Sequence, residues 1–405
     1  MADLAQKFAR LGTDNAPGQE VRQRLSEADL PLRGEALPGT FVDFSHGDVD
    51  AFTPTPGAFE LFAEGVRRGG AQAYTEYRGS LEIRNTLAQR LAQFTGAPVA
   101  GDEDMILTTG TQGALFLAAA STIARGTRVA IVEPDYFANR KLVEFFEGEL
   151  VPIPLDHLQA QGRAGIDLDR LEHSFSKGVD VFLFSNPNNP TGVIYSPEEI
   201  AAIARLAARH GVTVIVDQLY SRLLYEGEDY THLRAQDLGD SPVITIMGPS
   251  KTESLSGYRL GVAFGAPALI ERMEKLQAIV ALRAAGYNQA VFGTWFAEPE
   301  GWMAERIRQH QAIRDAMLAA LRAVPGLQVR TPQAGSYVFP QLPPLVMSGL
   351  DFVRVLRLQG NAIVTPGTEF SPHAASSIRF NFSQDAQAAV AAAKRIAALI
   401  ERYRA

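Results

Sequence analysis

Lys251 stands just past a short apolar run and is a candidate nucleophile. The run Val243–Met247 leads into it through Gly-Pro-Ser, and Arg259 follows eight residues later, ahead of a second apolar run, Leu260–Phe264. Open α/β sheets form their ligand crevice past the carboxyl ends of strands, and this lysine falls at such a place. A solvated surface lysine is the alternative interpretation, because most lysines in folded proteins are exposed.

Asp217 puts a carboxylate at the end of another apolar run, Val214–Val216, and Tyr220 follows it by three residues. Burial of a carboxylate without a partner is costly, so a partner is expected here. A carboxylate that faces a buried cationic group stays ionised and keeps the proton on that group. The sequence therefore predicts that Asp217 faces a cation at the same edge of the sheet as Lys251.

A turn around Gly110, Thr111 and Gln112 connects a strand to a helix. Such a turn exposes unpaired backbone N–H groups and the positive end of the helix dipole, which together attract anions. An ordinary strand-to-helix turn capped by threonine is the alternative. The segment has neither a Walker nor a Gly-x-Gly-x-x-Gly pattern, so it does not imply a nucleotide.

Three other segments carry polar or aromatic groups next to apolar runs. Ser185–Gly192 reads Ser-Asn-Pro-Asn-Asn-Pro-Thr-Gly, a sharply defined loop because asparagine, proline and glycine each fix turn geometry. Tyr136 lies shortly after the predicted strand Arg128–Val132. Its ring could stack on a flat ligand ring or pack against other side chains of the protein. Arg379 lies within the apolar strand Ser377–Phe382 and could grip a carboxylate in bidentate fashion or form a structural salt bridge.

Short, unalternating apolar runs alternate with helical segments over the middle of the chain. This pattern is typical of strands covered by helices on both faces of a mainly parallel sheet. Seven strands are predicted at Met105–Thr108, Arg128–Val132, Leu150–Ile153, Val181–Phe184, Thr213–Val216, Val243–Met247 and Gly261–Phe264. The main helices are predicted at Ser80–Phe94, Gln112–Ala124, Phe137–Glu147, Leu168–Phe175, Pro197–His210 and Ala266–Ala284.

The pattern changes after residue 290 to long helices and short strands. The expected elements there are helices Trp302–Val324, Asp351–Gln359 and Asp385–Tyr403 and strands Ser336–Phe339, Ala362–Val364 and Ser377–Phe382. We therefore predict an α/β protein with an N-terminal arm that forms part of the small domain (1–49), a large domain with a seven-stranded sheet (50–290) and a smaller α+β domain (291–405).

Composition excludes several classes of protein. The 405 residues are 46% hydrophobic and 20% charged, enough for two domains with ample cores. A net charge of −7 without a basic run argues against nucleic acid as a partner. The absence of cysteine excludes disulfides and thiol chemistry, and the seven histidines show no metal-ligand spacing. No run has the length of a signal-peptide core or a membrane span, so a cytoplasmic protein without membrane contact is expected.

Taken in order, these motifs resemble the class I/II aminotransferase family, the fold-type-I pyridoxal-phosphate enzymes, over about residues 41–385. The most specific pieces are Asn-Pro-x-Asn-Pro-Thr-Gly, Asp-x-x-Tyr at Asp217, and Ser-Lys at Lys251 followed by Gly-x-Arg. The resemblance implies an aspartate-aminotransferase-like fold, in which the strand Gly261–Phe264 runs antiparallel to the rest. It also implies pyridoxal 5'-phosphate as cofactor and a homodimer with shared active sites.

The resemblance assigns roles in cofactor chemistry. Lys251 would form the internal aldimine and then move the proton at the substrate α-carbon. Asp217 would pair with the pyridine nitrogen and keep the ring an electron sink, while Tyr220 and Asn189 would bond the ring hydroxyl oxygen. Tyr136 would stack on the ring. The phosphate would be held by Gly110, Thr111, Gln112, Ser250, Arg259 and, from the neighbouring subunit, Tyr74.

On the substrate side, Arg379 would hold the α-carboxylate, with Gly47 and Asn189 lining the same pocket. Arg283 is a candidate for a distal carboxylate, although as the last turn of the helix Ala266–Ala284 it also suits a helix C-terminus. His46 and Arg78 are candidates for the pocket mouth, with a structural or solvated role as the alternative. The expected reaction moves an amino group from a common L-amino acid to 2-oxoglutarate or pyruvate.

Three positions depart from the family pattern: Gly248 replaces a phosphate-binding hydroxyl, Gln218 replaces a glutamate, and Tyr258 stands where other residues are common. Loss of one hydroxyl should weaken phosphate binding by about 1 kcal/mol. Two other functions stay open on the same scaffold. One is a C–S lyase or amino-acid synthase that shares the carbanion chemistry. The other is a non-catalytic binding or regulatory protein, which the intact set of site residues disfavours.

Overall fold

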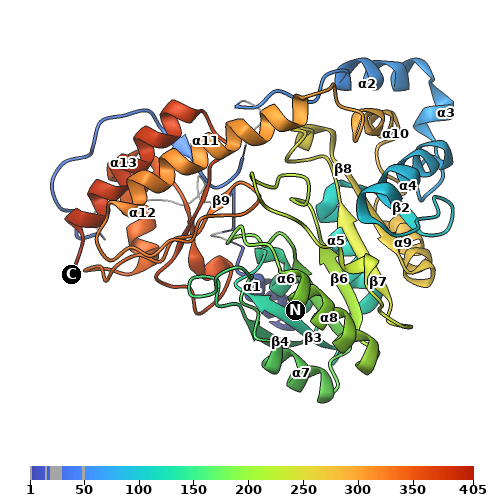
Figure 1. The fold of residues 1–405 in the computed structure, drawn as a ribbon, viewed down its shortest axis with the longest axis horizontal. Helices are drawn as coiled ribbons and strands as arrows, with labels where there is room; N and C mark the ends of the chain where they lie inside the picture. The colour runs from blue at the N-terminus through green and yellow to red at the C-terminus, as the bar shows by residue number, and fades with distance from the viewer. Residues whose placement is uncertain (1, 14–15, 19–29, 48–50) are drawn as a thin grey trace.

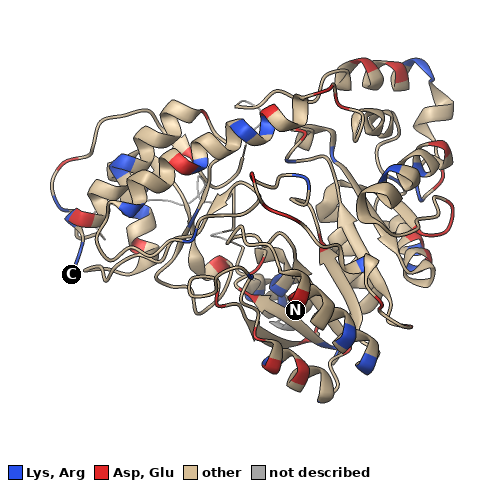
Figure 2. Cartoon of the chain, in the orientation of Figure 1, with Lys and Arg blue, Asp and Glu red and all other residues tan. Residues whose placement is uncertain are grey.

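The computed structural model describes residues 2–13, 16–18, 30–47 and 51–405, so part of the predicted N-terminal arm lies outside the described residues. Figure 1 shows a sheet with helices on either side and, next to it, a lobe built mainly from the C-terminal third of the chain. Among the described helices, none is long and apolar enough to cross a bilayer. Lysine, arginine and acidic residues are interspersed over both parts, as Figure 2 shows.

The seven-stranded sheet has the order β2-β8-β7-β6-β5-β3-β4. β8 runs antiparallel to both of its neighbours, and the other pairs are parallel, as predicted. Every predicted strand is present to within one residue at either end. The strands are β2 (Met105–Thr109), β3 (Arg128–Glu133), β4 (Glu149–Pro154), β5 (Val181–Ser185), β6 (Thr213–Asp217), β7 (Val243–Met247) and β8 (Leu260–Gly265).

Alternate residues of the same strands enter two different cores. On β5, Phe182 and Phe184 pack with one cluster, while Val181 and Leu183 pack with the other. A strand buried on both faces needs no polar alternation, which explains the continuous apolar runs in the sequence. The covering helices are α4 (Leu81–Thr95), α5 (Gly110–Thr122), α6 (Phe137–Phe145), α7 (Leu168–Ser176), α8 (Pro197–His210) and α9 (Pro267–Val280).

Local sequence signals fix the ends of α8. The Ser196 hydroxyl accepts a hydrogen bond from the Glu199 N–H, and the Glu199 carboxylate accepts one from the Ser196 N–H, which is a capping box. Pro197 occupies the first turn, and Gly211 ends the helix with a φ of 66°. These signals explain why this helix was predicted to the residue.

The strand register brings the predicted polar residues to one edge. Ser185 at the end of β5 pairs with Asp217 at the end of β6, and Asp217 pairs with Ile246 on β7. Since these strands are parallel, the chain leaves all three on the same side of the sheet, and Lys251 follows β7 there.

The second lobe is an α+β unit around its own hydrophobic core. Val42 of β1 pairs in parallel with Ala362 of β10, so a strand from the N-terminal region joins this lobe. β12 lies between β11 and β9 in a separate three-stranded sheet. The elements are β1 (Val42–Asp43), α11 (Trp302–Arg322), β9 (Tyr337–Val338), α12 (Gly349–Gly360), β10 (Ala362–Ile363), β11 (Thr365–Pro366), η6 (Gly367–Glu369), β12 (Ile378–Asn381) and α13 (Ala386–Arg402).

Several further short elements complete the fold, and α9 is four residues shorter at its C-terminal end than predicted. α9 ends at Val280, because Leu282 adopts a left-handed φ of 60°, so Arg283 lies beyond the helix and not in its last turn. The other elements are α1 (Ala2–Leu11), α2 (Ala58–Arg67), α3 (Gly70–Ala73), α10 (Gly286–Gln289), η3 (Leu233–Ala235), η4 (Ser256–Tyr258) and η5 (Ala290–Thr294). The domain limits 1–49, 50–290 and 291–405 stay a prediction.

Candidate active site

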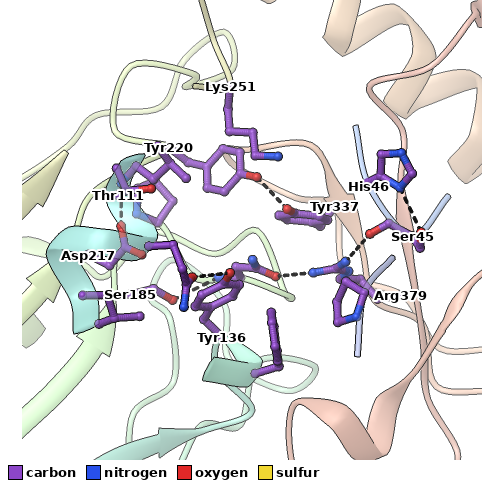
Figure 3. A pocket seen from close by; sticks show the side chains of 17 residues that line it. Ser45, His46, Thr111, Tyr136, Ser185, Asp217, Tyr220, Lys251, Tyr337 and Arg379 are labelled. Carbon is purple, nitrogen blue, oxygen red and sulfur yellow. Dashed lines mark hydrogen bonds between the residues drawn. The ribbon is translucent and has the colours of Figure 1, made fainter. Parts of the chain in front are cut away.

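A cavity of about 420 Å³ lies where the strand ends of the large sheet meet the second lobe. Its lining includes Lys251, Asp217, Tyr220, Asn189 and Arg379, five of the residues predicted to act together. Figure 3 shows Asp217 on one side, Arg379 on the other, and Lys251 reaching in between them. The volume is that of a small-molecule site.

The turn before α5 forms a tight backbone cradle. Gly110 has a left-handed φ of 71°, and a Cβ on Gly110 would lie 2.5 Å from the Arg259 guanidinium. A Cβ on Gly261 would lie 2.3 Å from the Gly110 carbonyl carbon and 2.4 Å from the Thr111 nitrogen. The backbone approach therefore requires glycine at both positions. It sets a helix N-terminus beside an arginine, which is an arrangement suited to a phosphate group.

Gly248, which departs from the family pattern, has a steric reason. A Cβ at this position would lie 2.8 Å from the Thr111 methyl group and 3.0 Å from the Leu260 carbonyl oxygen. The side chain of Thr111 thus fills the space that a serine at 248 would need, and Thr111 lines the cavity. Ser250 is 7% exposed, and its hydroxyl lies 3.4 Å from the Leu260 carbonyl oxygen.

Asp217 lies at one end of the cavity with one backbone hydrogen bond, from the Leu219 N–H at 3.0 Å. Burial raises the pKa of Asp217 to about 6, and the Leu219 hydrogen bond opposes this only in part. A cation placed against the carboxylate would offset that desolvation and keep it ionised. The site is thus suited to a ligand with a protonated nitrogen at this end.

Asn189 is held in place through a buried carboxylate. Its backbone N–H donates to the Ser185 hydroxyl at 3.1 Å, and Ser185 in turn donates its hydroxyl and its N–H to Asp135. Asp135 also accepts the Tyr136 N–H at 2.6 Å. Burial raises the pKa of Asp135 to about 8, although these hydrogen bonds counteract it. The network orients Asn189 and Tyr136, whose hydroxyl donates to Gln112 at 2.9 Å.

Arg379 projects from β12 with one guanidinium nitrogen unpaired among the described residues. Its guanidinium donates to the Asn189 side-chain oxygen at 3.0 Å and to the Ser45 carbonyl at 2.7 Å, while Nε has no partner among the described residues. The side chain is 2% exposed and lies between the rings of Tyr337 and Phe370, at 4.3 and 4.6 Å. Its recorded partners among the described residues are an amide oxygen and a backbone carbonyl and not a carboxylate, so it can bind a carboxylate from a ligand.

Other predicted residues lie outside the cavity. Tyr74 is 79% exposed at the far end of the molecule, and the Arg283 guanidinium lies 5.2 Å from its ring centre. Arg78 binds Glu274 at 2.6 Å and has a structural role. Gly47 lines a smaller adjacent cavity that shares Lys251.

His46 does line the main cavity, beside Ser45. The prediction missed Tyr337, Asp135 and Ser185. Tyr337 lies on the short strand β9, within hydrogen-bonding distance of Tyr220. The sequence predicted a strand at Ser336–Phe339, but its pattern did not distinguish Tyr337 from its neighbours.

Comparison with known proteins identifies the family. Residues 40–396 match the family described as aminotransferase class I and II. Since this match spans most of the chain, the protein belongs to that family, and it is an aminotransferase.

Several proteins similar to this chain are aspartate aminotransferases. The chain is 26% identical over 405 residues to an aspartate aminotransferase from Musicola paradisiaca, covering 100% of this chain and 98% of the relative. It is 64% identical to the crystal structure of an aspartate aminotransferase from Rhodobacter sphaeroides, with a TM-score of 0.94 and coverage of 99% and 100%. Aspartate aminotransferase from Thermus thermophilus with maleate, at 24% identity, TM-score 0.80 and coverage of 89% and 92%, shares the fold.

Proposed function

We propose that this aminotransferase uses pyridoxal 5'-phosphate and takes L-aspartate as its amino donor, with 2-oxoglutarate or pyruvate as acceptor. The observation that carries the proposal is one cavity that holds a lysine, a carboxylate in need of a cation, and an arginine with a free donor. The donor follows from the aspartate aminotransferases among the relatives, since the cavity itself assigns only an α-carboxylate.

The residues present fit the cofactor at three points. The cradle of Gly110, Thr111 and Gln112, with Arg259 and Ser250, suits the phosphate. Asp217 would pair with the ring nitrogen, and Tyr136 would lie on the ring face. The bound cofactor supplies an electron sink for the electrons left at the substrate α-carbon.

Other residues would bind the substrate and move its proton. Arg379, with Asn189 fixing its guanidinium, would bind the α-carboxylate and set the substrate's orientation. The Lys251 amine would take the proton from the α-carbon and hold it close by until it is returned. Tyr220 would direct its hydroxyl to the ring hydroxyl oxygen. Gly47 packs closely against β12, because a Cβ there would lie 2.8 Å from the Asn381 side chain.

We also propose a homodimer. Exposed apolar side chains follow α3 and lie at the end of α9, and both elements lie at one end of the molecule in Figure 1. Ile279 is 82% exposed and Tyr74 is 79% exposed, which is unusual for a surface that faces water. A second copy covering these side chains would bring Tyr74 toward the partner's phosphate site. The exposed side chains are those of Tyr74, Tyr77, Ile279, Val280 and Leu282.

The test compares Lys251→Ala with Lys275→Ala, whose lysine pairs with Glu271 on the surface and is 72% exposed. Each protein is loaded with pyridoxal phosphate, and visible absorbance and stopped-flow spectra with L-aspartate are recorded. We expect K275A to bind and convert the cofactor like the unsubstituted protein. K251A should lose the visible absorbance of the lysine-linked cofactor and the conversion with L-aspartate. Ammonia release without any acceptor would instead indicate a lyase. If another amino acid converted the cofactor and L-aspartate did not, the assignment of L-aspartate as amino donor would be wrong. The cytoplasmic location stays a prediction.

A further inference from the structure

Tyr337 stands at the centre of the site although the sequence did not single it out. On β9 it pairs with Asn381 of the antiparallel strand β12, and Arg379 lies two residues from that partner. Side chains two residues apart on a strand share a face, so Tyr337 and Arg379 are diagonal neighbours. Tyr337 is 4% exposed, lines the cavity and lies under the Arg379 guanidinium at 4.3 Å.

The Tyr337 hydroxyl forms a short hydrogen bond with the residue proposed to contact the cofactor. The Tyr220 hydroxyl donates to Tyr337 Oη at 2.6 Å, and both side chains are buried. Figure 3 shows the two hydroxyls next to the Lys251 side chain. Each phenol has a single proton, so the pair can donate in only one direction at a time.

The surroundings make Tyr337 the more acidic of the two. Burial raises its pKa, but the charges of Arg379 and Lys251 and the hydrogen bond from Tyr220 bring the pKa below its ordinary value. Burial, and then the proximity of Tyr337, raise the pKa of Tyr220. The other titratable group that faces Tyr337 is Tyr136, whose pKa is raised mainly by burial. A more acidic phenol is a stronger hydrogen-bond donor, so Tyr337 is well suited to donate once Tyr220 directs its own proton elsewhere.

We propose that Tyr337 is a positioning residue for the transamination reaction, because its hydroxyl donates to Tyr220 and so directs the Tyr220 proton to the ring hydroxyl oxygen of the cofactor. The inference rests on the proposed function. In this chain of two hydrogen bonds, donation by Tyr337 strengthens donation by Tyr220. Negative charge on the ring oxygen is thereby stabilised, and the nitrogen of Lys251 joined to the cofactor holds its proton less tightly.

The test is the pH titration of the visible absorbance of the pyridoxal-phosphate-loaded enzyme. Tyr220→Phe should raise the midpoint by about 1 to 2 pH units, the size of one lost hydrogen bond to a charged oxygen. Tyr337→Phe, which keeps the ring under Arg379, should raise it by about 0.3 pH units, the cooperative share of that bond. Tyr195→Phe is the matched control: this tyrosine is 1% exposed, its hydroxyl has no partner among the described residues, and it lies outside the cavity lining.

The double variant Y220F/Y337F separates a role through Tyr220 from a general structural effect. If Tyr337 acts through Tyr220, its substitution adds nothing once the Tyr220 hydroxyl is gone. The proposal would be overturned if Tyr337→Phe shifted the titration midpoint equally in the unsubstituted protein and in Y220F. It would also be overturned if Y337F had the same midpoint as Y195F while Y220F had a higher one. Loaded samples of all variants without visible absorbance would instead overturn the proposed cofactor.

Discussion

Replacing Arg222 by methionine should destabilise the protein, because two buried carboxylates share this one cation. Arg222 donates two hydrogen bonds to Glu298, at 2.8 and 3.0 Å, and a third to Glu253. The side chains of Glu253 and Glu298 are 1% and 7% exposed. The guanidinium also lies 4.0 Å from the centre of the Phe296 ring, and Glu253 is two residues from Lys251.

The size of the effect follows from this burial. Removing one partner of a buried ion pair costs about 3 to 5 kcal/mol, because an uncompensated charge is left behind. For 405 residues the unfolding entropy is about 0.85 kcal/mol/K, so a loss of about 4 kcal/mol corresponds to a melting temperature about 5 °C lower. Methionine fills a similar volume, which keeps a cavity from adding to the loss.

Differential scanning calorimetry of the cofactor-loaded protein at pH 8 checks this, with Arg209→Met as control. Arg209 binds Glu172 at 2.6 Å on the surface, where both side chains are more than half exposed, so its removal should change little. The triple variant R222M/E253Q/E298Q removes the charges together and should regain most of the stability. A melting temperature for R222M within about 1 °C of R209M would refute the reasoning, since surface pairs alone contribute this little.

The same cluster predicts a pH dependence. Burial raises the pKa of Glu253 from 4.5 to about 7, and Arg222 offsets this only in part because most of its donors go to Glu298. Between these two values the folded chain binds more protons than the unfolded chain, so this residue lowers stability as pH rises through the window. Glu253→Gln cannot ionise, so above pH 7 it should avoid a loss of about 3 kcal/mol in the free energy of unfolding. If the free energy of unfolding of E253Q fell with pH as steeply as that of the unsubstituted protein, between about pH 5 and pH 7, the prediction would be wrong.

Two other substitutions test the cradle and the dimer. Gly261→Ala should push the Thr111 backbone away and weaken cofactor binding by at least about tenfold, measured by equilibrium dialysis, whereas Gly257→Ala, with open space around its Cβ, should bind normally. Equal affinities for both would show that the close approach is unimportant. Ile279→Asp should convert the dimer to monomers in sedimentation velocity, because a charge in an apolar interface core is unfavourable, and it should loosen the phosphate site that Tyr74 is proposed to complete. A dimer unaffected by this charge would place the interface elsewhere.

The large domain could be predicted closely because its signals are local. Apart from the edge strand β4, each strand of the large sheet is a run of largely buried apolar residues, and Asp217 and Lys251 lie at or shortly after the end of a strand. Asp217 and Lys251 could therefore be placed at one edge from chain order alone, once the strands were taken as parallel. The end of α9 was predicted wrongly for the opposite reason. The left-handed residue there is Leu282, and not the glycine that usually marks a helix end in a sequence.

The substrate side of the site depends on contacts that no local pattern encodes. β9 has two residues, and only its pairing with β12 places Tyr337 beside Arg379. Asp135, which orients Asn189 through Ser185, lies 50 residues away from that serine in sequence. Chain order therefore predicts where cofactor chemistry occurs, because parallel strands bring their ends together in any case. The residues that surround the substrate depend on how the second lobe packs against that edge. Tyr337 belongs to the second lobe, so its place in the cavity could be recognised only from the structure of both lobes.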